Sequence, residues 1–130
     1  MTSAPTALLV DDDTPLTYVL QRYAISYGAH LIAADFYGPV VTLARQKQPA
    51  VILLSITGDD ERGRSVLRAL RSDPRTRAIP IVLCTAHEID QHGWAAEADR
   101  VVVQPVMYVD FAAILDQLTQ PALGAIDRPT

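Results

Sequence analysis

Two kinds of hydrophobic pattern alternate along this chain. Five short runs are continuously apolar, which is typical of strands buried on both faces of a parallel sheet. These runs cover residues 7–10, 31–34, 51–54, 81–83 and 101–103. The pattern therefore predicts a sheet of five strands that is covered on both sides.

The segments between these runs have apolar residues at helical spacing, so that one side of each segment can cover the sheet. Four helices are predicted, with apolar stripes formed by Leu16, Val19, Leu20, Tyr23 and Tyr27; by Val40, Val41 and Ala44; by Val66, Leu67 and Leu70; and by Phe111, Ile114, Leu115 and Leu118. Between the fourth and fifth strands, residues 89–98 are interrupted by Gly93. We expect a short or irregular helix there.

Strands that alternate with helices predict right-handed crossovers and an α/β fold. No glycine-rich nucleotide loop follows the first strand. We therefore expect a doubly wound, flavodoxin-like parallel sheet of order 2-1-3-4-5, in which sites lie at the carboxyl ends of the first and third strands. The polar residues there are Asp11, Asp12, Asp13 and Ser55, with Thr85 and Gln104 at the ends of the last two strands.

Length and composition indicate one small domain. The chain has 130 residues and a formal charge of −4, which excludes a broad positive field for nucleic acid. No apolar run approaches the roughly 18 residues of a membrane span, there is no secretory signal, and Cys84 is the only cysteine. We expect a cytoplasmic domain over residues 7–119, with an N-terminal tail at 1–6 and a tail or linker at 120–130.

Arginines are concentrated in one part of the chain. Six of them lie between residues 62 and 77. A solvated helix face with the loop after it is the simplest interpretation, and an acidic partner is the alternative.

Four segments in order, LLVDDD, VILLSI, IPIVLCTA and ADRVVVQP, resemble the signature segments of response regulator receiver domains, the CheY-like family. The resemblance runs from about residue 7 to residue 118. It implies a module to which a histidine kinase transfers a phosphoryl group on an aspartate, with the help of Mg²⁺.

The resemblance also assigns family roles to individual positions. Asp11 and Asp12 match the acidic pair that binds Mg²⁺, and Thr85 matches the switch hydroxyl. The phosphoacceptor position is occupied by Ser55, and the lysine position by Gln104, which Pro105 follows as in the family. Val101 stands where the family has its switch aromatic residue.

These substitutions predict a degenerate receiver, or pseudo-receiver. A serine hydroxyl needs an adjacent base to act as a nucleophile, and glutamine lacks the charge that stabilises a transferring phosphoryl group. We expect a non-enzymatic module that signals by protein contact, without phosphorylation. We expect no required cofactor. The alternative is weak Mg²⁺ binding by Asp11 and Asp12, because Mg²⁺ prefers more oxygen ligands than this pair supplies.

Other interpretations of these residues stay open. Asp13 fits a helix N-cap, and Ser55 could be a modified serine or a locally hydrogen-bonded one. Asp59 and Asp60 fit a solvated turn better than a substitute phosphoacceptor. Ser55 and His87 could belong to a hydrolase, but no G-x-S-x-G elbow is present, and Cys84 fits core packing. A small-molecule or nucleotide sensor using the former phosphorylation pocket is the main functional alternative.

Aromatic and methionine residues near the end of the chain suggest a contact surface. In receivers the usual surface combines the fourth helix, fifth strand and fifth helix, and Trp94, Met107 and Tyr108 fall in those segments. The expected partner is a signalling protein, a histidine kinase, an output domain or a second copy, with no direct nucleic-acid or membrane contact. Alternatively these side chains cover the sheet edge while Phe111 lies in the core.

Overall fold

The structure is a computed structural model, and it describes residues 4–11, 14–36, 38–56, 61–86 and 93–118. The five strands are β1 (Thr6–Val10), β2 (His30–Ala34), β3 (Val51–Ile56), β4 (Ile81–Thr85) and β5 (Arg100–Val103). The helices are α1 (Thr14–Tyr27), α2 (Val40–Lys47), α3 (Glu61–Ser72), the 3-10 turn η1 (Trp94–Glu97) and α4 (Tyr108–Leu118).

All strand pairs are parallel, and the sheet has the order β2-β1-β3-β4-β5. The predicted doubly wound topology is confirmed. Both β3 and β4 run two residues further than their apolar runs, so that Ser55 and Thr85 lie inside strands. Sheet pairing, rather than hydrophobicity, sets these ends: Ser55 is opposite Cys84, and Ile56 is opposite Thr85.

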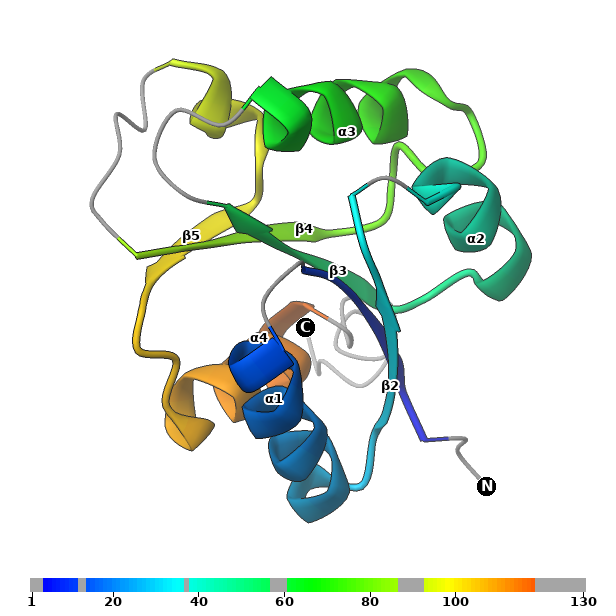
Figure 1. Cartoon of the computed structure of the whole chain (residues 1–130). Helices are drawn as coiled ribbons and strands as arrows, with labels where there is room; N and C mark the ends of the chain where they lie inside the picture. Colours follow the sequence, from blue (N-terminus) through cyan, green and yellow to red (C-terminus); the bar gives the residue numbers. More distant parts are fainter. Residues whose placement is uncertain (1–3, 12–13, 37, 57–60, 87–92, 119–130) are drawn as a thin grey trace, which may run out of the picture.

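Helices cover both faces of the sheet (Figure 1). On one face lie α2 and α3, and on the other lie α1 and α4. Alternate residues of β1 show the division, since Leu8 packs toward α2 and α3 while Leu9 packs toward α1 and α4. Burying the strands on both faces explains their continuous apolar sequence.

The helical stripes are confirmed at most positions. In α1, Leu16 and Leu20 are buried, but Val19 is 36% exposed. The prediction that Val19 belongs to the buried stripe is therefore wrong, because Leu16 and Leu20 occupy the inward positions. Val19 borders a surface groove instead.

A single short turn, η1, stands between β4 and β5 in the described part of that connection. This matches the expected irregular helix, and residues 87–92 lie outside the described residues. After η1, the Asp99 N–H donates a 2.8 Å hydrogen bond to the Ile81 carbonyl, which aligns the entry to β5 with the start of β4.

One arginine links several of these connections. The Arg71 guanidinium, at the end of α3, donates hydrogen bonds to the carbonyl oxygens of Glu97, Arg77 and Ile79. Nothing in the apolar pattern predicted this role, because its acceptors are backbone atoms distant in the sequence.

Candidate functional site

The carboxyl edge of the sheet brings four polar residues together. Val10 of β1 pairs with Leu54 of β3, so Asp11 and Ser55 are the next residues on adjacent strands. Thr85 at the end of β4 accepts a 2.7 Å hydrogen bond on its carbonyl oxygen from the Gln104 N–H, which follows β5. The residues singled out at strand ends therefore lie along one edge.

Asp11 is held in place by its neighbours. Its side chain is largely buried, with 8% of the residue exposed. Its N–H donates a 2.8 Å bond to the Ala34 carbonyl of β2, and its Oδ2 accepts a 3.0 Å bond from the Thr17 hydroxyl of α1. Thr17 therefore helps to position the carboxylate. Asp12 and Asp13 lie outside the described residues.

Thr17 is a contributor that the sequence analysis missed. It lies in the second half of the first turn of α1, six residues after Asp11. A hydroxyl residue near the start of a helix, shortly after an acidic strand end, is only a weak indication of such a hydrogen bond. It becomes informative only when the first residue of the helix is known.

Cys84 lies beside Ser55 and is fully enclosed. Burial, and to a lesser degree the nearby negative charge of Asp11, raise the pKa of the Cys84 thiol to about 12. The thiol is therefore protonated at neutral pH, which agrees with a packing role and not with a nucleophile. His87, the base of the hydrolase alternative, lies outside the described residues, as do Asp59 and Asp60.

The remaining family positions lie on β4 and β5. The Thr85 side chain is buried, and Val101 packs against the core that α2 and α3 cover. The peptide bond between Gln104 and Pro105 is cis. Val101 thus fills a packing position with a small aliphatic side chain.

Metal ligands are few in the part of the edge that the structure describes. Within those residues no group of three or more histidine, cysteine, aspartate or glutamate side chains could hold a metal ion. Asp11 is the described carboxylate of the predicted acidic pair, and one of its oxygens already accepts the Thr17 hydrogen bond.

The predicted contact residues lie beside α1. Met107 is 54% exposed and lines a groove of about 330 Å³ together with Pro15, Val19 and Tyr23. The Tyr108 ring packs edge-on against Tyr23, with centroids 5.6 Å apart. Both residues therefore face α1 at the start of α4, while Phe111 is in the core as predicted. The Trp94 side chain is outside the described structure.

No family model matches the chain. Four curated proteins are similar in sequence, and two of them illustrate the match. Protein PilH of Pseudomonas aeruginosa is 33% identical over 81 residues, covering 62% of this chain and 67% of PilH. The transcriptional regulatory protein AfsQ1 of Streptomyces coelicolor is 30% identical over 105 residues, covering 78% of this chain and 45% of AfsQ1.

Solved structures agree with this similarity. The receiver domain of the sensor histidine kinase PA1611 from Pseudomonas aeruginosa, with magnesium in its active site cleft, superposes with a TM-score of 0.77 at 21% identity and covers 90% of this chain and 98% of that one. Vibrio cholerae chemotaxis protein CheY4 superposes with a TM-score of 0.77 at 19% identity, and the match covers 89% of this chain and 99% of CheY4. The chain belongs to the response regulator receiver family.

This receiver corresponds to less than half of AfsQ1, so the regulatory activity of that protein concerns a longer chain. The resemblance drawn from the four sequence segments is confirmed at the level of family and fold. The roles assigned to Asp11, Ser55 and Gln104 stay predictions. No helix among the described residues of the receiver is long and apolar enough to span a bilayer.

Proposed function

We propose that this receiver is a pseudo-receiver, which forms no aspartyl phosphate and signals by binding other proteins. The observation that carries the proposal is Ser55. It stands beside Asp11 at the carboxyl edge of the sheet, where the family resemblance places the phosphoacceptor aspartate.

The chemistry of this position supports the proposal. A carboxylate can form an acyl phosphate directly, whereas a serine hydroxyl must lose its proton to a base as it attacks phosphorus. The described neighbours of Ser55 include the protonated Cys84 thiol on β4 and the carboxylate of Asp11. The protonated thiol cannot act as a base, and Asp11 Oδ2 accepts the hydroxyl of Thr17 and not that of Ser55.

The charge balance supports it further. Phosphoryl transfer depends on cations that offset the charge on the transferring oxygens. Gln104 replaces the family lysine with a neutral amide side chain, and its backbone N–H donates to the Thr85 carbonyl at the edge of the sheet. The edge therefore lacks one fixed positive charge that the family chemistry requires.

Magnesium fits this edge poorly. In the PA1611 receiver a magnesium ion is coordinated in the active site cleft. Here Ser55 supplies a neutral oxygen at the family carboxylate position, and the described carboxylate, Asp11, is engaged by Thr17. Mg²⁺ prefers carboxylates and several oxygen ligands. The proposed function therefore needs no cofactor, and any Mg²⁺ binding is weak.

Exposed apolar side chains favour signalling by contact. Large apolar residues are exposed on α1 and around the start of α4, namely Tyr18, Val19, Ile25, Met107, Tyr108 and Val109. Such residues on one side of a small protein are typical of a binding surface. The partner is a signalling protein, such as a kinase or an output domain, or a second copy of the receiver.

The deciding experiment measures phosphoryl incorporation from radiolabelled acetyl phosphate in the presence of Mg²⁺. The wild-type protein is expected to take up no label, and Ser55→Asp combined with Gln104→Lys is expected to gain it. Incorporation by the wild type that is lost in Asp11→Asn or Asp12→Asn would overturn the proposal, since it would show that the acidic pair still supports phosphoryl transfer.

A further inference from the structure

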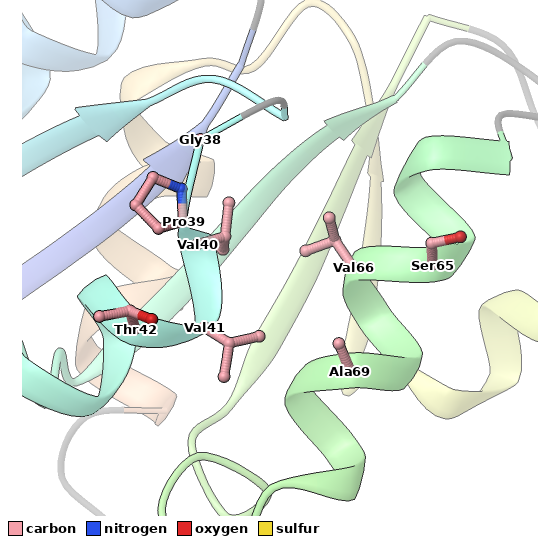
Figure 2. A pocket seen from close by; sticks show the side chains of 8 residues that line it. All are labelled: Gly38, Pro39, Val40, Val41, Thr42, Ser65, Val66 and Ala69. Carbon is pink, nitrogen blue, oxygen red and sulfur yellow. The ribbon is translucent and has the colours of Figure 1, made fainter.

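A shallow apolar groove runs between α2 and α3. Its volume is about 340 Å³. The lining residues are Gly38, Pro39, Val40, Val41, Thr42, Ser65, Val66 and Ala69. Figure 2 shows Val41 of α2 and Val66 of α3 directed into the space between the two helices. The floor of the groove is therefore aliphatic, with hydroxyl groups at its margins.

The two helices that form the groove are basic. They contain six basic residues and one acidic residue, Glu61, and so have a formal charge of +5 in a chain of net charge −4. The basic residues are Arg45, Lys47, Arg62, Arg64, Arg68 and Arg71. Positive charge is therefore concentrated on α2 and α3, in a chain that is acidic overall.

Ion pairs neutralise part of this charge. Arg64 pairs with Glu61 at 3.7 Å, Arg71 with Asp99 at 2.7 Å, and Arg45 with Asp73 at 2.5 Å. Lys47 and Arg68 are exposed residues of these two helices. Asp35 lies beside Gly38, which lines the groove at the start of α2.

Arginines flank the groove and help to fix its shape. Arg68 is exposed, adjacent to Ala69 and one turn after Ser65, so it lies at the margin of the α3 wall. Arg62 is one turn before Val66, and its guanidinium carbon lies 5.9 Å from the centre of the Phe36 ring. At the far end, the Arg45–Asp73 pair connects α2 to the loop after α3.

We propose that this groove binds an acidic amphipathic helix of a partner protein. Apolar residues spaced at i, i+3 or i+4 and i+7 would contact Val41, Val66 and Ala69, as in other helix-in-groove complexes. Aspartate or glutamate residues beside that stripe would face Arg68. This inference goes beyond the proposed function, because the groove involves neither Ser55 nor the α1 and α4 surface.

The lining favours a protein helix over nucleic acid. Phosphate groups would use the arginines but would gain nothing from an aliphatic floor, whereas an amphipathic helix uses both features. The overall charge of −4 also means that an acidic peptide has no general attraction to this protein. Binding of such a peptide would therefore depend on the groove and the arginines beside it, and not on the overall charge.

The test uses a synthetic, acetylated amphipathic peptide of about 18 residues, long enough to form a helix, with a leucine stripe and flanking glutamates. The control peptide has lysines in place of the glutamates. Binding is followed by fluorescence anisotropy and by amide shifts in ¹⁵N NMR spectra of the whole chain. We expect saturable binding of the glutamate peptide only, with the largest shifts at Val41, Ser65, Val66 and Ala69.

Two substitutions separate charge from shape. Arg68→Glu should raise the Kd by roughly 3- to 10-fold, since it loses one attraction and adds one repulsion, and salt should weaken binding. Ala69→Gln, which fills the groove without changing charge, should weaken binding by at least a similar factor. Arg22→Glu is the matched control, because Arg22 is exposed on α1, on the opposite face of the sheet from the groove. This substitution should leave the Kd unchanged.

Three results would overturn the inference. The first is a titration in which the glutamate peptide does not saturate. The second is a set of amide shifts centred on α1 and α4. The third is tighter binding of a single-stranded DNA oligonucleotide than of the peptide, with DNA binding unaffected by Ala69→Gln. Shifts on α1 and α4 would instead agree with the proposed function. None of the three bears on the phosphorylation assay, so the two proposals fail independently.

Discussion

Arg71 and Asp99 form a 2.7 Å ion pair that joins the end of α3 to the residue before β5. The same Asp99 oxygen accepts a 2.8 Å hydrogen bond from the Ile81 N–H at the start of β4. The pair therefore connects three segments on one side of the sheet.

Removing the arginine should destabilise the protein. Arg71→Leu leaves Asp99 and the carbonyl oxygens of Glu97, Arg77 and Ile79 without this donor. Because the pair is partly solvated, the expected loss is about 2 kcal/mol, measured as the free energy of unfolding in urea. Arg68→Leu, on the same helix and exposed, should change stability by less than about 0.5 kcal/mol. Equal losses of stability in the two variants would show that the Arg71 contacts do not stabilise the fold.

The buried thiol gives a second prediction. Cys84 is fully buried and its pKa is raised to about 12, so the folded protein should react with Ellman's reagent at pH 8 only as fast as it opens. Addition of urea above the unfolding midpoint should release one reactive thiol per chain, because Cys84 is the only cysteine. Rapid reaction of the native protein would contradict the burial.

A third prediction concerns the bond between α1 and α4. The Tyr27 hydroxyl donates a 2.5 Å hydrogen bond to Asp116, and this bond, with partial burial and the charge of Asp116, raises the pKa of Tyr27 from 10.0 to about 12. Absorbance titration at 295 nm should show one late-ionising tyrosine that is lost in Tyr27→Phe. In Asp116→Asn its pKa should fall toward 10.

The same bond makes stability depend on alkaline pH. In the unfolded chain Tyr27 ionises near pH 10, while the folded protein holds that proton until about pH 12. The unfolded state therefore loses protons first, and the stability contributed by this bond declines between those values. Urea midpoints should fall more steeply with pH in the wild type than in Tyr27→Phe, and parallel slopes would exclude the bond as the cause.

A fourth prediction tests the metal at the sheet edge. Mg²⁺, with or without beryllofluoride, should produce only small, non-saturating amide shifts at Asp11, Ser55 and Thr85, because Ser55 offers no carboxylate. Ser55→Asp adds that ligand and should tighten Mg²⁺ binding by at least about 10-fold. Saturating wild-type shifts at millimolar Mg²⁺ would show that Asp11 and Asp12 suffice to hold the ion.

Most of the fold could be predicted because its strands are buried on both faces. Continuous apolar runs located all five strands, and alternation with helices gave their order. The strand ends were less clear, since Ser55 and Thr85 are polar residues held in strands by pairing with β4 and β5. Backbone pairing leaves no mark in a hydrophobic pattern.

For the candidate site, the sequence predicted which edge of the sheet carries it but not the contacts of its side chains. Topology alone places Asp11 and Ser55 on adjacent strands, but the Thr17 hydrogen bond depends on where α1 begins. Met107 and Tyr108 were expected on a contact surface or over the sheet edge, and their packing beside α1 could not be predicted, since the direction of a side chain at a helix start depends on the loop before it. The Arg71 contacts involve backbone acceptors, which no residue type reveals.

The position of β1 in the sheet has a consequence for synthesis. It lies between β2 and β3, so the first of these five strands to leave the ribosome is an interior one. Once residues up to Lys47 have emerged, β2 can pair with β1, but the other edge of Ala7–Val10 is unpaired, and these residues are fully buried in the finished protein. Until residues 51–56 emerge, that apolar edge is open to other chains. Emergence of β3 is therefore the step that protects this edge from contact with other chains.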